Sequence, residues 1–138
     1  MTVQFTIDSP PVPKARPRLT RKGHAYTPKA TRQYEAVVAE AARAAMDGLE
    51  PLTGPVQAVL HFNMPIPKSW SKKAKKEALG EYHVKRPDLD NLVKAVIDGC
   101  EGVVYDNDSK IVRITALKSY SDEPCTWVRF TNADYKPF

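Results

Sequence analysis

The chain has 138 residues, of which 42% are hydrophobic and 27% are charged, and its formal net charge is +5. This length suits one domain, and because no apolar run approaches the roughly 20 residues of a membrane helix, no membrane span is expected. Only two cysteines occur, with no nearby Cys or His at zinc-like spacing, so the sequence suggests neither a disulfide framework nor a structural zinc site. The N-terminus lacks the pattern of a secretory signal, so we expect a cytoplasmic protein with a single domain over residues 1–138.

The first elements are a strand and a helix separated by a long loop. Apolar and polar residues alternate over residues 3–7, which predicts a half-buried strand. The proline-rich, basic chain that follows is expected to be an exposed loop up to Arg21. Thr27 and Pro28 then offer an N-cap and a first-turn proline, and the apolar spacing beyond them predicts a helix that stops near Gly48.

The middle of the chain contains a second strand and the best-patterned helix. Alternating apolar residues predict a strand over residues 56–64, which the following prolines end. Residues 68–76 are rich in lysine and are compatible with either a short exposed helix or a flexible arm. Residues 89–100 carry an apolar stripe with helical period and predict a helix ending near Gly99 or Gly102.

Two more strands are predicted at the end of the chain. They cover residues 111–120 and 126–132, and we expect the turn SDEPC to join them as an antiparallel hairpin. The order strand, helix, strand, helix, strand, strand predicts a small α/β domain. Its sheet should be mixed or antiparallel, with about four strands and with the helices packed on one face.

Positive charge gathers in two stretches of the sequence. Residues 1–34 hold seven Lys and Arg against Asp8 alone, and residues 68–76 hold five lysines and no acid. Either stretch alone is compatible with a merely solvated surface, but together they indicate a polyanion, with nucleic acid as the leading partner. Arginine forks suit phosphates because they are planar and permanently charged. The candidate DNA-binding residues are Lys14, Arg16, Arg18, Arg21, Lys22, Lys72, Lys73, Lys75 and Lys76.

A pair of aspartates stands at the beginning of the predicted helix of residues 89–100. Asp88 and Asp90 would point roughly 200° apart if both were helical, so at least one must lie outside the helix. Pro87 disfavours helical geometry in the residue before it, and aspartate is a good N-cap. Asp88 is therefore expected on the incoming chain and Asp90 in the first turn, where both carboxylates could converge beyond the helix end. Complementing the positive end of the helix is the structural alternative.

A second acidic patch, YDNDSK, follows the helix and contains Asp106 and Asp108. If the chain reverses there, one of them could approach the first pair. Converging carboxylates repel one another unless a proton or a cation intervenes, and an all-oxygen site suits Mg²⁺ or Mn²⁺ rather than zinc. Taken alone, Asp108 is better explained as a simple turn residue, just as Asp88 alone is better explained as a simple cap. A calcium loop is excluded because Ile111 stands where the required glycine should be.

Two segments, KRPDLDNLVKAVIDG and VVYDNDSKIV, together resemble the RusA family of Holliday junction resolvases. PVPKARPR, MPIPKSWSKK and ITALKSY support the resemblance more weakly. It implies a metal-dependent endodeoxyribonuclease, often encoded by phages and prophages, that nicks four-way DNA junctions symmetrically as a homodimer. By position it implies that Asp88, Asp90 and Asp108 bind Mg²⁺, with Mn²⁺ as a substitute, and that Lys94 is the functional lysine.

The second patch departs from the family pattern, because many relatives have two adjacent aspartates where this chain reads Asp106, Asn107 and Asp108. Asn107 can ligate through its carbonyl oxygen but carries no charge, and Asp106 is a candidate substitute. Lys94 could neutralise transition-state charge or pair with Asp90 one turn earlier. Two rival functions also fit the sequence: a junction-binding or DNA-packaging accessory protein, and a nuclease acting on flaps, forks or RNA.

Overall fold

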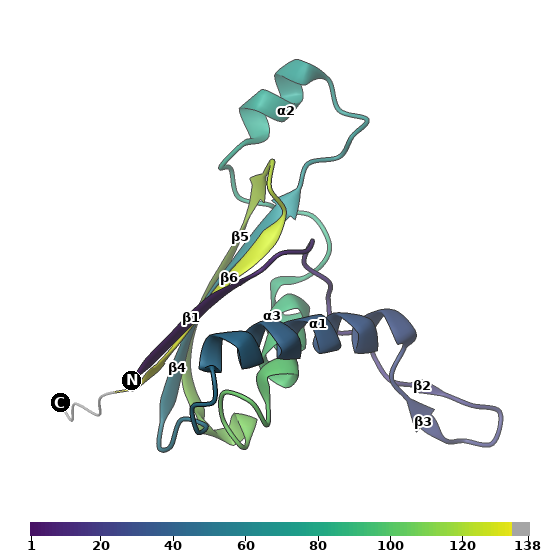
Figure 1. The fold of residues 1–138 in the computed structure, drawn as a ribbon. Coiled ribbons are helices and arrows are strands. Elements are labelled where there is room, and N and C mark those ends of the chain that lie inside the picture. Colours follow the sequence, from purple (N-terminus) through teal and green to yellow (C-terminus); the bar gives the residue numbers. More distant parts are fainter. Residues whose placement is uncertain (134–138) are drawn as a thin grey trace.

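A mixed four-stranded sheet forms the centre of the molecule (Figure 1). The computed structural model describes residues 1–133. The strand order is β1-β6-β4-β5, in which β6 is antiparallel to both of its neighbours and β5 is parallel to β4. The expected α/β class with a mixed sheet is therefore confirmed. The strands are β1 (Thr2–Ile7), β4 (Val56–Pro65), β5 (Ile111–Ser121) and β6 (Cys125–Asn132).

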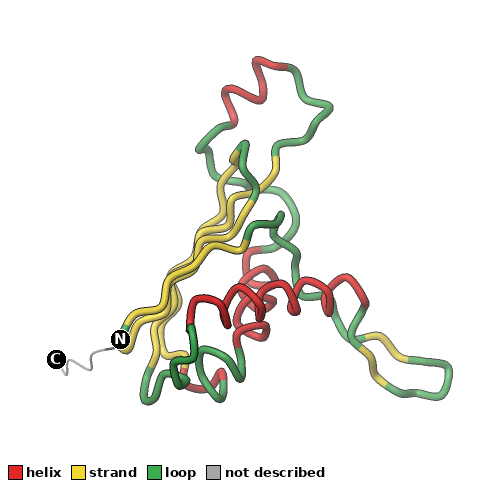
Figure 2. The backbone as a smooth tube through the Cα atoms, in the orientation of Figure 1, coloured by secondary structure: helices red, strands yellow, loops and turns green. Residues whose placement is uncertain are grey.

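Two helices, α1 (Lys29–Met46) and α3 (Leu89–Cys100), pack on one face of this sheet, whereas α2 (Lys72–Ala78) lies beyond one end of it (Figures 1 and 2). The core forms where the helix stripes meet the alternating residues of the strands. Within residues 1–133, none of the helices is long and apolar enough to cross a membrane. On β4 the residues buried in this core are Val56, Ala58, Leu60, Phe62 and Met64.

The two packed helices approach closely at Gly99. A Cβ atom at this position would lie 2.8 Å from both Cβ and Cγ1 of Val38 and 3.3 Å from the carbonyl oxygen of Glu35. Because real Cβ atoms do not approach carbon this closely, the absence of a side chain at Gly99 lets α3 rest directly on α1. The position of α3, and of every acidic residue on it, depends on this contact.

The predicted hairpin between the last two strands is wrong. β5 and β6 do not pair with each other within the described chain, because β4 lies between them. The segment from β4 to β5 is a crossover containing α3, which is the connection that two parallel strands require. The turn after Ser121 then carries the chain past β4 to its other edge. A short turn between two strands thus did not indicate that they are neighbours.

The end of the loop predicted up to Arg21 is instead the first strand of a small hairpin. Its strands, β2 (Arg18–Leu19) and β3 (Ala25–Tyr26), are antiparallel and have only two residues each. At the next element, Pro28 rather than Thr27 takes the N-cap position of α1. The lysine-rich stretch forms the short helix α2, which settles the choice that the sequence left open.

Candidate active site

The beginning of α3 has the predicted arrangement. Asp88 is the N-cap residue with extended backbone geometry, and Asp90 lies in the first helical turn. Both side chains are exposed. The Asp88 carboxylate makes no capping hydrogen bond to the described part of the chain, although its carbonyl oxygen accepts a bond from the N–H of Leu92 at 3.2 Å. The carboxylate oxygens of Asp88 are therefore available to an external cation.

A pocket of about 630 Å³ lies between α3 and the beginning of β5. Its polar lining consists of Asp90, Lys94, Asp98 and Asp108. Asp88 lines a neighbouring pocket instead. The structure thus places Asp90, Lys94 and Asp108 around one pocket, and Asp88 on the adjacent surface. The other wall of the first pocket is apolar and is formed by Leu89, Val93, Ile97, Ile114 and Ala116.

Asp108 begins a short 3-10 helix, η1 (Asp108–Lys110), just before β5. Its backbone N–H donates to Glu101 Oε1 at 3.1 Å, and the side chain of Asn107 accepts from the N–H of Ser109 at 2.9 Å. Asp106 is exposed and forms an ion pair with Lys110 at 2.8 Å, and the hydrogen bond from that lysine lowers the pKa of Asp106. Asn107 therefore caps η1, and Asp108 is the aspartate of this patch that lines the pocket.

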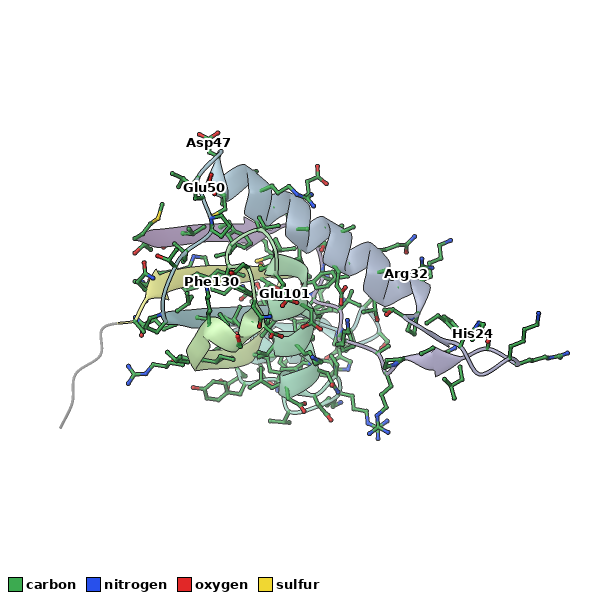
Figure 3. All side chains as sticks on the ribbon, turned by 90° about the horizontal axis from the view of Figure 1, so that it is seen from below. His24, Arg32, Asp47, Glu50, Glu101 and Phe130 are labelled. Atoms are coloured by element: carbon green, nitrogen blue, oxygen red, sulfur yellow. The ribbon has the colours of Figure 1, made fainter. Side chains whose placement is uncertain are left out.

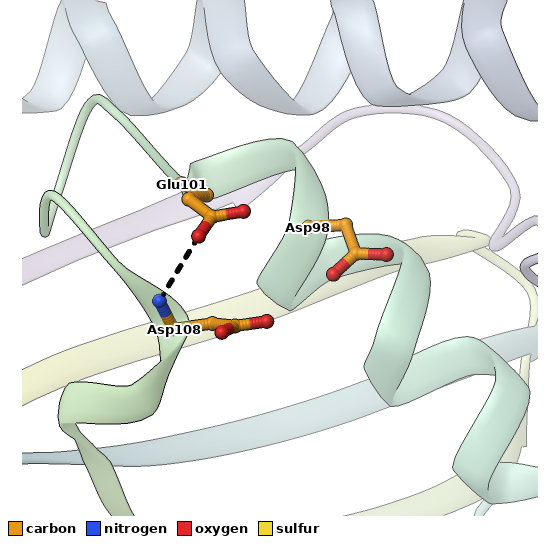
Figure 4. A group of neighbouring side chains, drawn as sticks. All are labelled: Asp98, Glu101 and Asp108. Atoms are coloured by element: carbon orange, nitrogen blue, oxygen red, sulfur yellow. Dashed lines mark hydrogen bonds between the residues drawn. The ribbon is translucent and has the colours of Figure 1, made fainter.

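Three carboxylates meet where α3 ends and η1 begins (Figure 4). Asp98, Glu101 and Asp108 each offer an oxygen atom, and these atoms lie within 4.8 Å of one another. Such a set has the hard oxygen donors that Mg²⁺ and Mn²⁺ prefer. The sequence analysis missed Asp98 and Glu101. Asp98 had a usable signal, since it stands four residues after Lys94 and eight after Asp90, on the same face of the helix.

Lysines compensate the charge of Asp98. Its Oδ2 atom lies 3.4 Å from Lys94 Nζ and 3.3 Å from Lys14 Nζ. Lys94 thus pairs with the acid one turn after it, rather than with Asp90 one turn before it. Lys94 therefore lines the same pocket as Asp90 and Asp108 while its ammonium group pairs with Asp98.

Lys14 differs from the other candidate DNA-binding residues. Its side chain is only 18% exposed and forms ion pairs with Glu35 of α1 and Asp98 of α3. Burial alone would lower its pKa, but hydrogen bonds and the charges of the two acids outweigh burial and raise it. Lys14 therefore links both helices to the N-terminal segment. The exposed candidates are Arg16, Arg18, Arg21, Lys22, Lys72, Lys73 and Lys76, and Lys75 is half-buried.

The β2–β3 hairpin projects from the body of the molecule, as two perpendicular views show (Figures 1 and 3). Its turn is well defined, because the N–H of Gly23 donates to the carbonyl of Thr20 at 2.9 Å, and that of Thr20 to the carbonyl of His24 at 2.8 Å. Gly23 has a φ of 80°, which only glycine adopts without strain. This turn presents Arg21 and Lys22 side by side at the exposed tip.

His83 lies buried in the segment before α3, with its ring centroid 4.8 Å from that of Tyr120. Burial lowers the pKa of His83, and the charges of Lys118 and Lys85 lower it further. Protonation therefore favours the unfolded chain. The stabilising effect of neutral His83 should be complete above a pH of about 6.5 and be lost below it, by at most about 1.4 kcal/mol per pH unit.

His83→Phe keeps an aromatic ring beside Tyr120 but cannot bind a proton. Urea unfolding of both proteins at pH 7.5 and 5.5 should show that the wild type loses more unfolding free energy on acidification than the variant does. Equal losses would contradict the assignment of this pH dependence to His83.

Comparison with known proteins places the chain among DNA-cleaving enzymes. Residues 8–131 match the family model described as Endodeoxyribonuclease RusA. The chain is also similar to the uncharacterized protein YqaN of Bacillus subtilis (strain 168), with 36% identity over 132 residues that cover 88% of this chain and 90% of that protein. The family match includes α3, η1 and the pocket between α3 and β5.

Proposed function

Because the chain belongs to the RusA endodeoxyribonuclease family, we propose that it is a Mg²⁺-dependent Holliday junction resolvase that makes paired symmetric nicks during DNA recombination and repair. The observation that carries the proposal is the pocket between α3 and β5, which Asp90 and Lys94 of α3 line together with Asp108 of η1. We propose further that residues 1–138 form one endonuclease domain, acting in the cytoplasm and encoded by a phage or prophage.

Asp88, Asp90 and Asp108 are the proposed ligands of Mg²⁺, for which Mn²⁺ can substitute. The donor set fits, since all three offer the carboxylate oxygens that Mg²⁺ prefers: Asp88 and Asp90 at the positive end of α3, and Asp108 from η1, beside the other end of the helix. A bound Mg²⁺ would lower the pKa of an attacking water and stabilise charge on the scissile phosphate. Lys94 would hold its ammonium group beside that phosphate, oriented by Asp98.

Asp98 and Glu101 offer a competing ligand set with Asp108. Two ammonium groups already neutralise Asp98, however, and Glu101 accepts the N–H of Asp108. These contacts favour a supporting role, in which Asp98 orients Lys94 and Glu101 fixes the backbone of Asp108. On this proposal, replacing Glu101 affects the placement of Asp108 rather than the number of charged ligands.

The proposed DNA surface consists of the β2–β3 hairpin and α2, which extend from the body in different directions (Figure 1). Their lysines and arginines would contact backbone phosphates, which positions the substrate without reading its sequence. A homodimer would supply two sites related by two-fold symmetry, which matches the approximate two-fold symmetry of a four-way junction. Selectivity for branched DNA would then follow from the spacing of the two sites.

The hairpin tip allows a specific prediction. Replacing both Arg21 and Lys22 by glutamine removes two phosphate contacts, so the slope of log affinity against log salt concentration should become shallower by up to about 2. Fluorescence anisotropy with a labelled four-way junction between low and moderate salt measures this slope. Replacing Arg43 and Arg113 by glutamine removes the same charge from exposed positions elsewhere and is the control. An unchanged slope at the hairpin would remove it from the DNA surface.

The proposed activity is tested by offering the protein four-way, flap, fork, linear and RNA substrates with Mg²⁺ or with EDTA. We expect paired cuts on opposite strands of the four-way junction in Mg²⁺ and no cutting in EDTA. Junction binding without cutting in any metal would favour the accessory-protein alternative. Preferential cutting of flaps, forks or RNA would favour a nuclease with the same site and a different substrate.

A further inference from the structure

Lys118 of β5 holds the segment that precedes α3 in three places. Its Nζ atom donates to the carbonyl oxygens of Lys85 at 2.6 Å and of Pro87 at 2.7 Å. Its own carbonyl oxygen accepts from the backbone N–H of His83 at 3.1 Å. Hydrogen bonds from an ammonium group are stronger than those between neutral groups. One residue of the sheet thus fixes this segment as far as the residue before Asp88.

The surroundings of the Lys118 side chain favour its hydrogen bonds to the carbonyls of Lys85 and Pro87. Lys118 pairs in register with Phe62, so it lies on the sheet face that carries the helices, and it is half-buried there. No carboxylate forms an ion pair with it in the structure of residues 1–133. The two carbonyl dipoles therefore provide the compensation for a partly desolvated charge, and losing the ammonium group would leave them without that donor.

Besides Lys118, the segment from Lys85 to Asp88 contacts the Trp70 ring, whose centroid lies 5.1 Å from the Lys85 ammonium group. Val84 just before it is 86% exposed, and Pro87 has no N–H to donate. Asp88 is exposed, and its side chain makes no capping bond to the described chain. The position from which the Asp88 side chain extends is set by the path of the backbone, which Lys118 fixes from one side and the first turn of α3 from the other.

Lys118 also connects Asp88 to the rest of the site. The strand that carries it begins immediately after η1, which contains Asp108. The same strand therefore continues directly from the short helix of Asp108 and, further along, holds the segment that leads to Asp88. We infer that Lys118 is a positioning residue, which sets the Asp88 carboxylate relative to Asp90 and Asp108 through the carbonyls of Lys85 and Pro87.

This inference relies on the proposed function for the identity of the site. The effect of the Lys118 hydrogen bonds on the segment before α3 can, however, be measured without DNA. Lys118→Met keeps the aliphatic stem and removes the donors. The control is Arg113→Met, because Arg113 is exposed on the opposite face of the same strand. Hydrogen exchange of the amides of His83 and Leu92, which are hydrogen-bonded on either side of the segment, should become about tenfold faster or more in Lys118→Met and stay unchanged in the control.

The functional readout separates positioning from general stability and from DNA contact. In Lys118→Met, the Mg²⁺ concentration for half-maximal junction cleavage should rise about tenfold or more, as when a partner of a metal ligand is removed. Junction affinity measured with Ca²⁺ in place of Mg²⁺ should not change. In an Asp88→Asn background, adding Lys118→Met should not raise the Mg²⁺ requirement further, because both changes act at the same ligand.

Three results would overturn the inference. Unchanged hydrogen exchange in Lys118→Met would show that the Lys118 side chain does not hold the segment before α3, whether or not the protein cuts DNA. Weaker junction binding at an unchanged Mg²⁺ requirement would make Lys118 a DNA contact. If Lys118→Met raises the Mg²⁺ requirement equally in the wild-type and Asp88→Asn backgrounds, Lys118 does not act through Asp88. If the wild type cuts no substrate, the proposed function fails, and hydrogen exchange still decides whether Lys118 holds the approach to Asp88.

Discussion

Asp90→Asn and Asp108→Asn are each expected to slow Mg²⁺-dependent junction cleavage by about 100-fold or more, the scale on which enzymes lose activity when a group stabilising the transition state is removed. Asparagine keeps the size of the side chain and one carbonyl oxygen but loses the charge that attracts a divalent cation. Both residues line the same pocket, so their effects should be similar. Single-turnover cleavage of a labelled four-way junction measures the rate directly.

Binding must be measured on the same proteins, because removing a carboxylate also makes the surface more positive. Asp8→Asn makes the same charge change at an exposed residue of the N-terminal segment and serves as the control. We expect all three variants to bind the junction at least as tightly as the wild type. If Asp90→Asn or Asp108→Asn cuts at the wild-type rate, the ligand assignment is wrong. Loss of activity in Glu101→Gln with Asp90→Asn fully active would instead favour the set formed by Asp98, Glu101 and Asp108.

Gly99→Val should lower the free energy of unfolding by about 2–3 kcal/mol, at the upper end of the usual cost of overpacking a core. Even the first added atom would lie 2.8 Å from the side chain of Val38, and the two further methyl groups have still less room. Valine is also a poor helix former, so helix propensity does not offset the clash as it partly would with alanine. Urea denaturation gives the change in unfolding free energy.

The origin of that cost can be checked with a double variant. Val38→Ala removes one of the two atoms that the new side chain would meet, so Gly99→Val should cost less in this background than in the wild type. Additive costs would contradict a direct contact between the two positions.

The packing of α1 against α3 is also connected to the candidate active site, because Glu35 on α1 binds Lys14, which reaches Asp98 on α3. Separating the helices should therefore also slow cleavage in the variant fraction that remains folded.

Local patterns in the sequence predicted the bounds of the main helices and strands well, but predicted poorly which strands pair with each other. The alternation over residues 56–64 and the apolar stripe over residues 89–100 correspond to β4 and α3 within a residue or two. Alternation does not encode which strand lies alongside, however. Hence the parallel pairing of β5 with β4 could not be read from residues 111–120 alone. The β2–β3 hairpin was missed because two-residue strands have too few positions to show a period.

The candidate site shows the same division. Asp88 and Asp90 could be placed correctly relative to the helix, since cap preference and the turn angle are local properties. The ion pairs of Lys14 with Glu35 and Asp98 could not be predicted, because they depend on three segments meeting in space. In the sequence Lys14 is one cation of a basic stretch, whereas in the structure it lies between two acids. Whether Asp88, Asp90 and Asp108 share a cation stays a prediction.

The route of the chain around α2 has a consequence for how such a molecule can diversify. The chain departs from the sheet at the end of β4 and returns beside β5, where the N–H of Gly80 donates to the carbonyl of Tyr120 and the N–H of Tyr120 to the carbonyl of Glu81. Departure and return are thus both anchored to the sheet. The segment between these two points, which contains α2, can therefore change in length or sequence while the residues that lead into α3 stay in place. On the proposed function, the reach of the protein over DNA and its cleavage site could then change independently.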